Sequence, residues 1–467
     1  MKQILLSLVL LLPGVTAPVI DSNQTWPKAT IIERVDSRFP GQSYALYLPG
    51  SFDPNKKWPI LYCLDARSRG KLPVLQFRDA AEEHGWILAG SNNAASDDPS
   101  LPMAQIVNAL WSDTHERLPI DEKRVYVTGF SGTARIACEM GMHFKGQIAG
   151  VIGCGAGFPY DLPSQIPFAY YGIVGDVDFN YFELKQLRSK LPKVQIPAHH
   201  IRIFHGRHEW PPPEVCSEAV EWLQFLAIKD GLTAVAPEVI DKIYSKRIHV
   251  ADSMRGEGDL FNAVYEYESI VRDFSSLRNV SNIQSRYMEL RSSKSFKKSL
   301  QEENDRDRQE QVYLTRLESL MRSLHADEGS LPPLGRVLAD LQVKKLKDIM
   351  SRKDSSQEKL SAQRMLQNAF VQNCFYLPGE LLRQKKYRAA VLSLQIAVEI
   401  DPENSAVWYS LAKAYALWGE EKKAVESLRT AVRKGFRDLD RLSNEESFKV
   451  LFKDKEFLQL LQGLQPR

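Results

Sequence analysis

Ser131 is the residue whose setting most clearly suggests chemistry. It stands in the sequence Gly129-Phe130-Ser131-Gly132, after a β-branched run at 124–128 and before a helix-like segment. A strand that ends in Gly-x-Ser-Gly and turns at once into a helix forms a nucleophile elbow, whose strained backbone lifts the hydroxyl clear of the sheet. The segment therefore predicts a nucleophilic serine, with an ordinary Ser-Gly turn as the alternative. One departure from the common motif is Thr133, which stands where a second glycine is usual.

A nucleophilic serine needs a base within hydrogen-bond reach and an acid that orients the base. After nucleophile elbows these partners follow in the order acid, then histidine, each on a loop after a strand. The loop at 175–180 offers Asp178, which we favour because it lies deeper in the loop, and Asp176 as the alternative. The loop at 205–212 offers His208, which we favour over His205 at the strand end.

The oxyanion of an acyl-transfer intermediate needs backbone amide donors. We expect the amide of Gly132, the residue after the nucleophile, and a second amide from the loop after the strand at 58–65. That loop makes Ala66 the favoured second donor and Arg67 the next. Side chains expected at the rim of the substrate site are Arg67, Asn92, Asn93 and Trp210, with loop capping as the alternative for the two asparagines.

Histidines are concentrated between residues 199 and 208, which raises the question of a metal site. His199 and His200 are adjacent in one predicted strand, so their side chains would point to opposite faces. No His-Glu-x-x-His pattern accompanies them. We therefore predict neither a metal nor any other cofactor.

These residues must be positioned by an alternation of strands and helices between residues 28 and 230. Such alternation at short intervals predicts an α/β fold, a mostly parallel sheet with helices on both faces. Strands are expected at 30–36, 42–49, 58–65, 86–91, 124–128, 148–154, 168–174 and 199–204, the first two as a hairpin. Helices are expected at 75–84, 101–117, 132–142, 182–190 and 214–229.

Beyond residue 231 strand patterns vanish and long helical patterns rich in Lys, Arg, Glu, Gln, Leu and Ala take over. We expect a helical region at 231–369, with a faint repeat around Ala263, and a tetratricopeptide-repeat domain at 370–467. Two copies 34 residues apart carry the repeat pattern, the second at Trp408, Leu411, Ala412, Tyr415, Ala424, Leu428 and Ala431 and the first at Ala390, Leu394 and Ala397. A generic helical bundle is the alternative.

The composition is that of a soluble globular protein with more than one domain. The chain has 467 residues, 43% hydrophobic and 25% charged, and a net charge of +3, which argues against a protein built to bind nucleic acid. Lys2, the apolar run at 4–12 and the small residues at 15–17 predict an export signal at 1–17, hence a periplasmic or secreted protein. No later segment reaches the length of a membrane span. The five scattered cysteines form no disulfide framework.

With these motifs in view, residues 28–230 resemble an α/β-hydrolase domain of the esterase type, in the polyhydroxybutyrate-depolymerase/feruloyl-esterase-like or dienelactone-hydrolase-like branch. The matching pieces are Gly129-Phe-Ser-Gly132, Gly175-Asp-Val-Asp178 and Gly206-Arg-His208-Glu-Trp. The loop after the third strand departs from the family, because it reads Asp65-Ala66 where a His-Gly pair is common. The resemblance implies hydrolysis of carboxylic esters through an acyl-enzyme.

We therefore expect an exported serine esterase that acts on an ester-containing small molecule or polymer. Only 47 residues separate Ser131 from Asp178, which leaves little room for an inserted lid and predicts an open site. The resemblance of residues 370–435 to tetratricopeptide repeats implies a role in protein binding or packing. The alternatives are a serine peptidase with the same triad and an inert hydrolase-like scaffold whose repeats bind a protein.

Overall fold

The computed structural model describes residues 26–98, 100–234, 237–326, 328–354 and 356–464. The predicted export signal at 1–17 lies outside the described residues. The chain forms two compact units, which meet in sequence at Gln301 and Glu302. Each unit is described by itself below.

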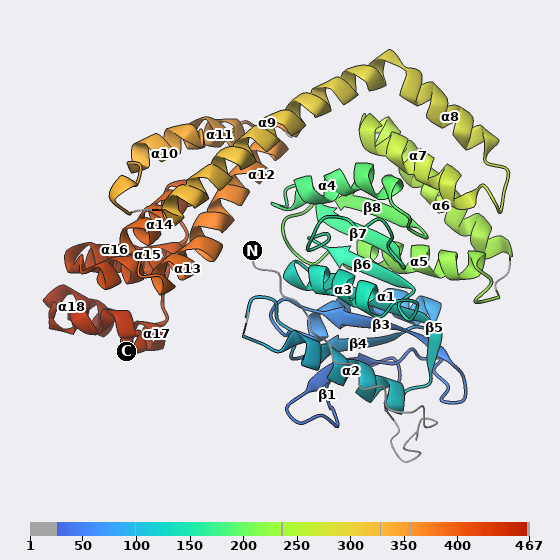
Figure 1. Cartoon of the computed structure of the whole chain (residues 1–467), viewed down its shortest axis with the longest axis horizontal. Coiled ribbons are helices and arrows are strands. Elements are labelled where there is room, and N and C mark those ends of the chain that lie inside the picture. Colours follow the sequence, from blue (N-terminus) through green and yellow to red (C-terminus); the bar gives the residue numbers. More distant parts are fainter. Residues whose placement is uncertain (1–25, 99, 235–236, 327, 355, 465–467) are drawn as a thin grey trace. The chain divides into compact units, whose positions relative to one another are not determined.

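The first unit is built on one twisted sheet, drawn in blue to green in Figure 1. Its strands, in spatial order, are β1 (Ile31–Asp36), β2 (Ser43–Tyr47), β4 (Ile87–Ser91), β3 (Trp58–Leu64), β5 (Ile120–Phe130), β6 (Gly150–Cys154), β7 (Ala169–Gly175) and β8 (His199–Phe204). Strands β1 and β2 pair antiparallel as the expected hairpin, and β2 also runs antiparallel to β4. The remaining neighbours are parallel, from β4 through β8. The predicted α/β fold class is therefore confirmed.

Helices cover both faces of the sheet because parallel strands need crossover connections. On one face α1 (Lys71–His84) and α5 (Pro213–Lys229) share an apolar core with the sheet. On the other face α2 (Met103–Arg117), α3 (Gly132–His143) and α4 (Tyr181–Lys190) complete a second core. Strands β3, β6 and β7 are almost continuously buried, since both of their faces are covered. This is a mostly parallel α/β sheet with helices on both faces.

The topology brings the loops of interest to one edge of the sheet. Strands β3, β5, β6, β7 and β8 are parallel and consecutive in the sheet, so their carboxyl ends meet on the same side. The loops that follow β3, β5, β7 and β8 are those that carry Ala66, Ser131, Asp178 and His208. Ligand sites of open parallel sheets lie at this carboxyl edge.

Three further helices complete the first unit: α6 (Pro237–Gly256), α7 (Leu260–Phe274) and α8 (Ser281–Ser292). They join the sheet-bearing part through a polar cluster in which Asp273 accepts hydrogen bonds from Trp222 Nε1 at 3.1 Å and from Arg247 at 2.6 Å. The rings of Phe225 and Phe274 pack beside it at a tilt of 31°, with their centroids 4.4 Å apart. The first unit reaches Gln301, and the domain bounds expected from the sequence at 28–230 and 231–369 stay predictions.

The second unit is entirely helical apart from its loops, as expected for the C-terminal part of the chain. It begins within α9 (Lys294–His325) and contains α10 (Leu334–Asp340), α11 (Val343–Met350), α12 (Gln357–Val371), α13 (Leu377–Arg383), α14 (Tyr387–Ile400), α15 (Ser405–Trp418), α16 (Glu421–Arg433), α17 (Leu439–Asn444) and α18 (Lys455–Leu464). One apolar core runs from α9 to α18 and contains residues on both sides of position 369.

The positions predicted to carry the repeat pattern are largely buried. Ala390, Leu394 and Ala397 of α14 and Ala424, Leu428 and Ala431 of α16 have no exposed surface. Consecutive helices α14, α15 and α16 pack on one another, which small residues at the crossings allow. A tetratricopeptide identity for this region stays a prediction.

No helix in the described ranges is both long enough and apolar enough to cross a membrane. Within the same ranges no three His, Cys, Asp or Glu side chains are grouped as a metal site would require. Four of the five cysteines are buried, and Cys374 is half-buried.

Candidate active site

Ser131 occupies a strained turn between β5 and α3. Its backbone has φ 57° and ψ −123°, a conformation that non-glycine residues rarely adopt. The turn is held by a hydrogen bond from the Ser131 amide to the Cys154 carbonyl at 2.8 Å. Gly129 is required here, because a Cβ at this position would lie 2.2 Å from the carbonyl oxygen of Thr133. The turn at Ser131 therefore has the strained strand-to-helix geometry expected from the Gly129–Gly132 motif.

Thr133 explains the departure from the usual motif. Its side chain is fully buried and accepts a hydrogen bond from the Phe130 amide at 3.0 Å. The same hydroxyl lies 2.7 Å from the Leu64 carbonyl, to which it donates. A glycine could make neither contact, so threonine ties the elbow to the end of β3, from which the Ala66 loop departs.

His208 lies between Ser131 and Asp178. Its Nε2 is 2.9 Å from the Ser131 Oγ, and its Nδ1 is 2.9 Å from each oxygen of the Asp178 carboxylate. Asp178 is only 1% exposed and also accepts a hydrogen bond from the Asn180 amide at 2.7 Å. Because a carboxylate only accepts, Nδ1 carries the proton and Nε2 is left to accept from the serine hydroxyl.

The alternative pair forms a separate contact. Asp176 Oδ2 lies 2.5 Å from His205 Nδ1, and the His205 side chain is 97% exposed. Asp176 also accepts from the Gly206 amide at 3.2 Å, so it braces the turn that leads to His208. The structure therefore brings Asp178 and His208, rather than Asp176 and His205, to the serine.

Two aromatic rings confine the His208 imidazole. Phe130, the residue before the nucleophile, lies 4.7 Å from it between ring centroids, and Phe179 lies 4.1 Å from it. The sequence analysis did not single out either ring. The sequence does place Phe130 directly before Ser131 and Phe179 directly after Asp178. This adjacency could have predicted that the two rings pack near the histidine.

The two predicted oxyanion donors are both free to act. Neither the Gly132 amide nor the Ala66 amide donates a hydrogen bond to another group in the described ranges. Gly132 is the first residue of α3, where helix amides lack intrahelical partners and the helix dipole favours negative charge. Ala66 follows β3, the sheet neighbour of β5.

The residues predicted for the rim have other partners. Asn93 accepts from the Ser43 amide and donates to the Gly41 carbonyl at 2.9 Å, and Asn92 donates to the Glu33 carbonyl at 3.1 Å. Both amides therefore cap the β1–β2 hairpin, the alternative considered for them. Arg67 stays largely exposed and pairs with Asp97 at 3.0 Å.

Trp210 is not at an exposed rim either, because its side chain is buried and only 8% of the residue is exposed. Its Nε1 donates to the Asp65 carboxylate at 2.8 Å, and its ring lies 5.5 Å from Phe130. Asp65 is fully buried and also accepts from Arg69 Nε at 2.8 Å and from the Arg67 amide at 2.9 Å. One carboxylate thus links the loop of Ala66 to the loop of His208.

Asp65 gives a prediction about stability and pH. Burial by itself raises the pKa of this carboxyl, but hydrogen bonds from Arg69, Trp210 and the Arg67 amide outweigh burial and lower the pKa below the ordinary 3.8. The resulting stability is present above pH 3.8 and is lost as the pH falls through the folded-state pKa. We expect Asp65→Asn to cost about 2–3 kcal/mol in the free energy of unfolding at pH 7.

Urea unfolding of Asp65→Asn and the unsubstituted protein at pH 7 and at pH 3 tests this. The difference between the two proteins should shrink at pH 3, because below pH 3.8 the unfolded wild-type chain takes up a proton at Asp65 that the folded chain, with its lowered pKa, binds less readily. The matched control is Asp79→Asn, whose exposed carboxylate pairs with Arg78 and should contribute little at either pH. A difference that stays constant with pH would show that the Asp65 charge is not its source.

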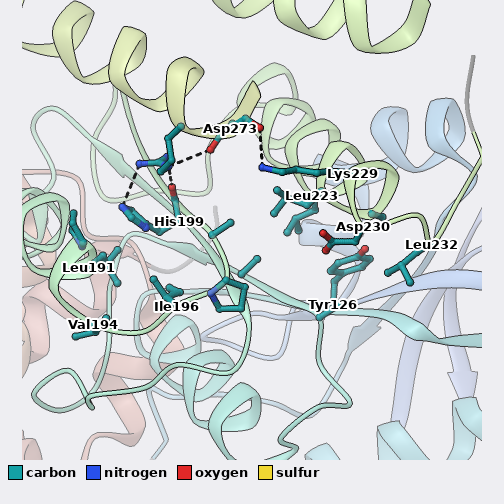
Figure 2. A pocket seen from close by; sticks show the side chains of 18 residues that line it. Tyr126, Leu191, Val194, Ile196, His199, Leu223, Lys229, Asp230, Leu232 and Asp273 are labelled. Atoms are coloured by element: carbon teal, nitrogen blue, oxygen red, sulfur yellow. Dashed lines mark hydrogen bonds and ion pairs between the residues drawn. The ribbon is translucent and has the colours of Figure 1, made fainter. Parts of the chain in front are cut away.

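A cavity of about 360 Å³ lies at the opposite edge of the sheet (Figure 2). Its walls include Ala169 and His199, the first residues of β7 and β8, and Tyr126 in the middle of β5. Burial, followed by the charge of Arg272, lowers the pKa of His199 to about 4, so this imidazole is neutral. Lys229 is held by the Asp273 carbonyl at 2.9 Å. None of the residues around Ser131 lines this cavity.

No protein-family model and no curated protein matches this chain. Solved structures match less than half of it, at low identity. The fluorophosphonate-binding serine hydrolase F of Staphylococcus aureus is 13% identical with a TM-score of 0.35, and the match covers 42% of this chain and 98% of that chain. An S-formylglutathione hydrolase from Agrobacterium tumefaciens is 12% identical with a TM-score of 0.32, covering 42% and 93%. The ferulic acid esterase of Anaeromyces mucronatus is 15% identical with a TM-score of 0.33, covering 44% and 93%.

Proposed function

We propose that the chain is a serine hydrolase that cleaves carboxylic esters through an acyl-enzyme. The observation that carries this proposal is the line of contacts from the Ser131 hydroxyl through His208 to the Asp178 carboxylate, each 2.9 Å long. These distances lie within the range needed for proton transfer to a general base. The strained Ser131 backbone supports the same reading, because such strain is maintained at functional sites.

In the proposed reaction, His208 Nε2 takes the proton of the Ser131 hydroxyl as its oxygen attacks the ester carbonyl. Asp178 holds the proton at Nδ1 and stabilises the imidazolium that forms. The amides of Gly132 and Ala66 donate to the oxyanion of the tetrahedral intermediate. His208 then gives this proton to the departing alcohol, which leaves an acyl-enzyme on Ser131. In the second half of the reaction His208 takes a proton from water as the water attacks the acyl group, and it returns that proton to the Ser131 oxygen as the carboxylic acid leaves.

The site is proposed to be open to extended or soluble esters. Between α3 and Asp178 the chain contains β6, β7 and the loops at 144–149 and 155–168, with no helix that could cover Ser131. The ordered contacts at 155–158 support this, because Asn180 donates to the Gly155 carbonyl at 2.7 Å and Glu183 accepts from the Gly157 amide at 2.9 Å. These bonds fix the first residues of the loop in place, which supports a site over which this part of the loop does not close.

Two further proposals concern the rest of the protein. The charged, apolar and small-residue pattern at 1–17 supports export, hence action in the periplasm or outside the cell. The repeat pattern of α14 to α16 supports binding of a protein partner by the helical region.

The test combines an activity-based probe with a panel of substrates. We expect covalent labelling by a fluorophosphonate and turnover of nitrophenyl acyl esters of graded chain length, feruloyl esters and soluble polyester oligomers. Peptide anilides serve as the comparison, and cleavage of anilides without esters would favour a peptidase. Absence of both labelling and turnover would contradict the proposed function and favour an inert scaffold.

A further inference from the structure

Ser96, in the loop between β4 and α2, has a buried hydroxyl that the proposed mechanism does not yet use. Its Oγ is inaccessible to solvent and has no hydrogen-bond partner in the part of the chain that the structure describes. Buried hydroxyls are nearly always hydrogen-bonded, so an isolated one calls for an explanation. A partner that is present only during the reaction is one such explanation.

The side chain of Ser96 lies against Gly132, the residue that follows the nucleophile. A Cβ at Gly132 would lie 2.4 Å from the Ser96 Oγ and 2.5 Å from the Ser96 Cβ. Ser96 therefore fills the space that a side chain at position 132 would take. This contact explains why the elbow has glycine there, and it places the hydroxyl beside the residue whose amide is the first oxyanion donor.

The loop of Ser96 is also tied to the second donor. The Asp97 amide donates to the Ala66 carbonyl at 3.2 Å, and the Ser68 amide donates to the Ala94 carbonyl at 3.0 Å. The Arg67 and Asp97 side chains form an ion pair across the same junction. Residues on both sides of Ser96 are thus bonded to the 66–68 segment, which holds the loop of Ser96 against the segment of the second predicted donor.

We propose that Ser96 is a third oxyanion donor, an inference that rests on the esterase function proposed above. Its O–H would turn toward the negative oxygen of the tetrahedral intermediate and keep its own proton throughout. A donor aimed at developing charge stabilises the transition state more than the neutral carbonyl of the substrate. Ser96 is not a second nucleophile, because no imidazole or carboxylate in the described ranges contacts its hydroxyl.

The test is Ser96→Ala in the full-length protein, assayed with a nitrophenyl acyl ester. We expect kcat to fall by about 10²-fold, the loss typical of one oxyanion donor, with KM changed less than about twofold. The affinity for a trifluoromethyl ketone, which forms a tetrahedral adduct with the serine, should fall in parallel. The melting temperature should stay unchanged or rise, since the substitution removes an unsatisfied buried hydroxyl.

The matched control is Ser100→Ala, an exposed serine of the same loop that bonds to Asp98, and its kcat should equal that of the unsubstituted protein. Equal kcat in Ser96→Ala and the unsubstituted enzyme would overturn the proposal. So would a loss accompanied by a lower melting temperature and unchanged ketone affinity, because that is the result of a structural role. Failure of the esterase function itself looks different, since it would leave the unsubstituted protein unlabelled and inactive.

Discussion

Replacing Ser131 with alanine is expected to lower kcat for a carboxylic ester by about 10⁶-fold and to abolish fluorophosphonate labelling. The substitution removes the oxygen that lies 2.9 Å from His208 Nε2, and no other hydroxyl contacts that imidazole in the described ranges. Residual turnover should come from the oxyanion amides and substrate binding alone. Mass spectrometry of the labelled protein measures the adduct, and steady-state kinetics measure the loss.

The control for this prediction is Ser217→Ala, a half-buried serine on α5 whose hydroxyl bonds to the Pro213 carbonyl. It should retain full labelling and turnover. Circular dichroism and the melting temperature should show that Ser131→Ala stays folded, because the residue contributes one side-chain hydrogen bond at the site edge. An adduct that persists in folded Ser131→Ala would show that the nucleophile lies elsewhere.

Replacing Asp178 with asparagine is expected to lower kcat by about 10⁴-fold. The carboxylate accepts from His208 Nδ1 through both oxygens, and an amide in its place can donate to that nitrogen instead. The imidazole would then carry its proton on Nε2, the nitrogen that must accept from Ser131. Steady-state kinetics with the same ester measure the effect, and KM should change little because Asp178 is buried beneath the imidazole.

Asp176→Asn is the matched control, since it changes the same chemical group two residues away. Its partner His205 is almost fully exposed, so turnover should fall by no more than a few-fold. Equal losses in the two variants would mean that both loops are needed only for folding. A larger loss in Asp176→Asn would make His205 the base, against the contacts seen at Ser131.

The order of the candidate site was predictable from the sequence because it depends on topology. Alternating strands and helices imply a parallel sheet, and the carboxyl ends of parallel strands meet at one edge. A serine after β5, an aspartate after β7 and a histidine after β8 are then neighbours whatever the details of the loops. The fold class followed from the same periodicity.

The choice within each loop was less accessible to sequence reasoning. Asp176 and Asp178 are two residues apart in one loop, so their spacing does not show which carboxylate reaches the histidine. What separates them is the turn itself, in which the Asp176 amide bonds to the Phe204 carbonyl and the Asp178 amide to the Gly175 carbonyl. These bonds set which carboxylate faces His208. The rim residues show the same limit, because Trp210 found a buried partner in Asp65, 145 positions earlier in the chain.

The domain boundaries illustrate a further limit. Composition changes near residue 231, yet α6 to α8 belong to the unit that contains the sheet. Asp273 of α7 accepts a hydrogen bond from Trp222 of α5, and the Phe274 ring packs against Phe225 of α5. The repeat pattern begins near residue 370, yet the apolar core of the second unit already includes Leu317 and Leu324 of α9. Local composition predicts which kind of element forms. Where a compact unit ends depends on which elements bury apolar side chains against one another.

The alternating α/β framework, the strained turn at Ser131 and the order of its partner loops follow from the sequence, since all three depend on short-range backbone preferences and strand polarity. Three contacts are visible only in the folded chain: Asp178 and His208 face Ser131, Asp65 joins two loops, and Ser96 lies against Gly132. Those contacts join residues far apart in the chain. Their distances depend on how whole elements pack, which no local pattern records.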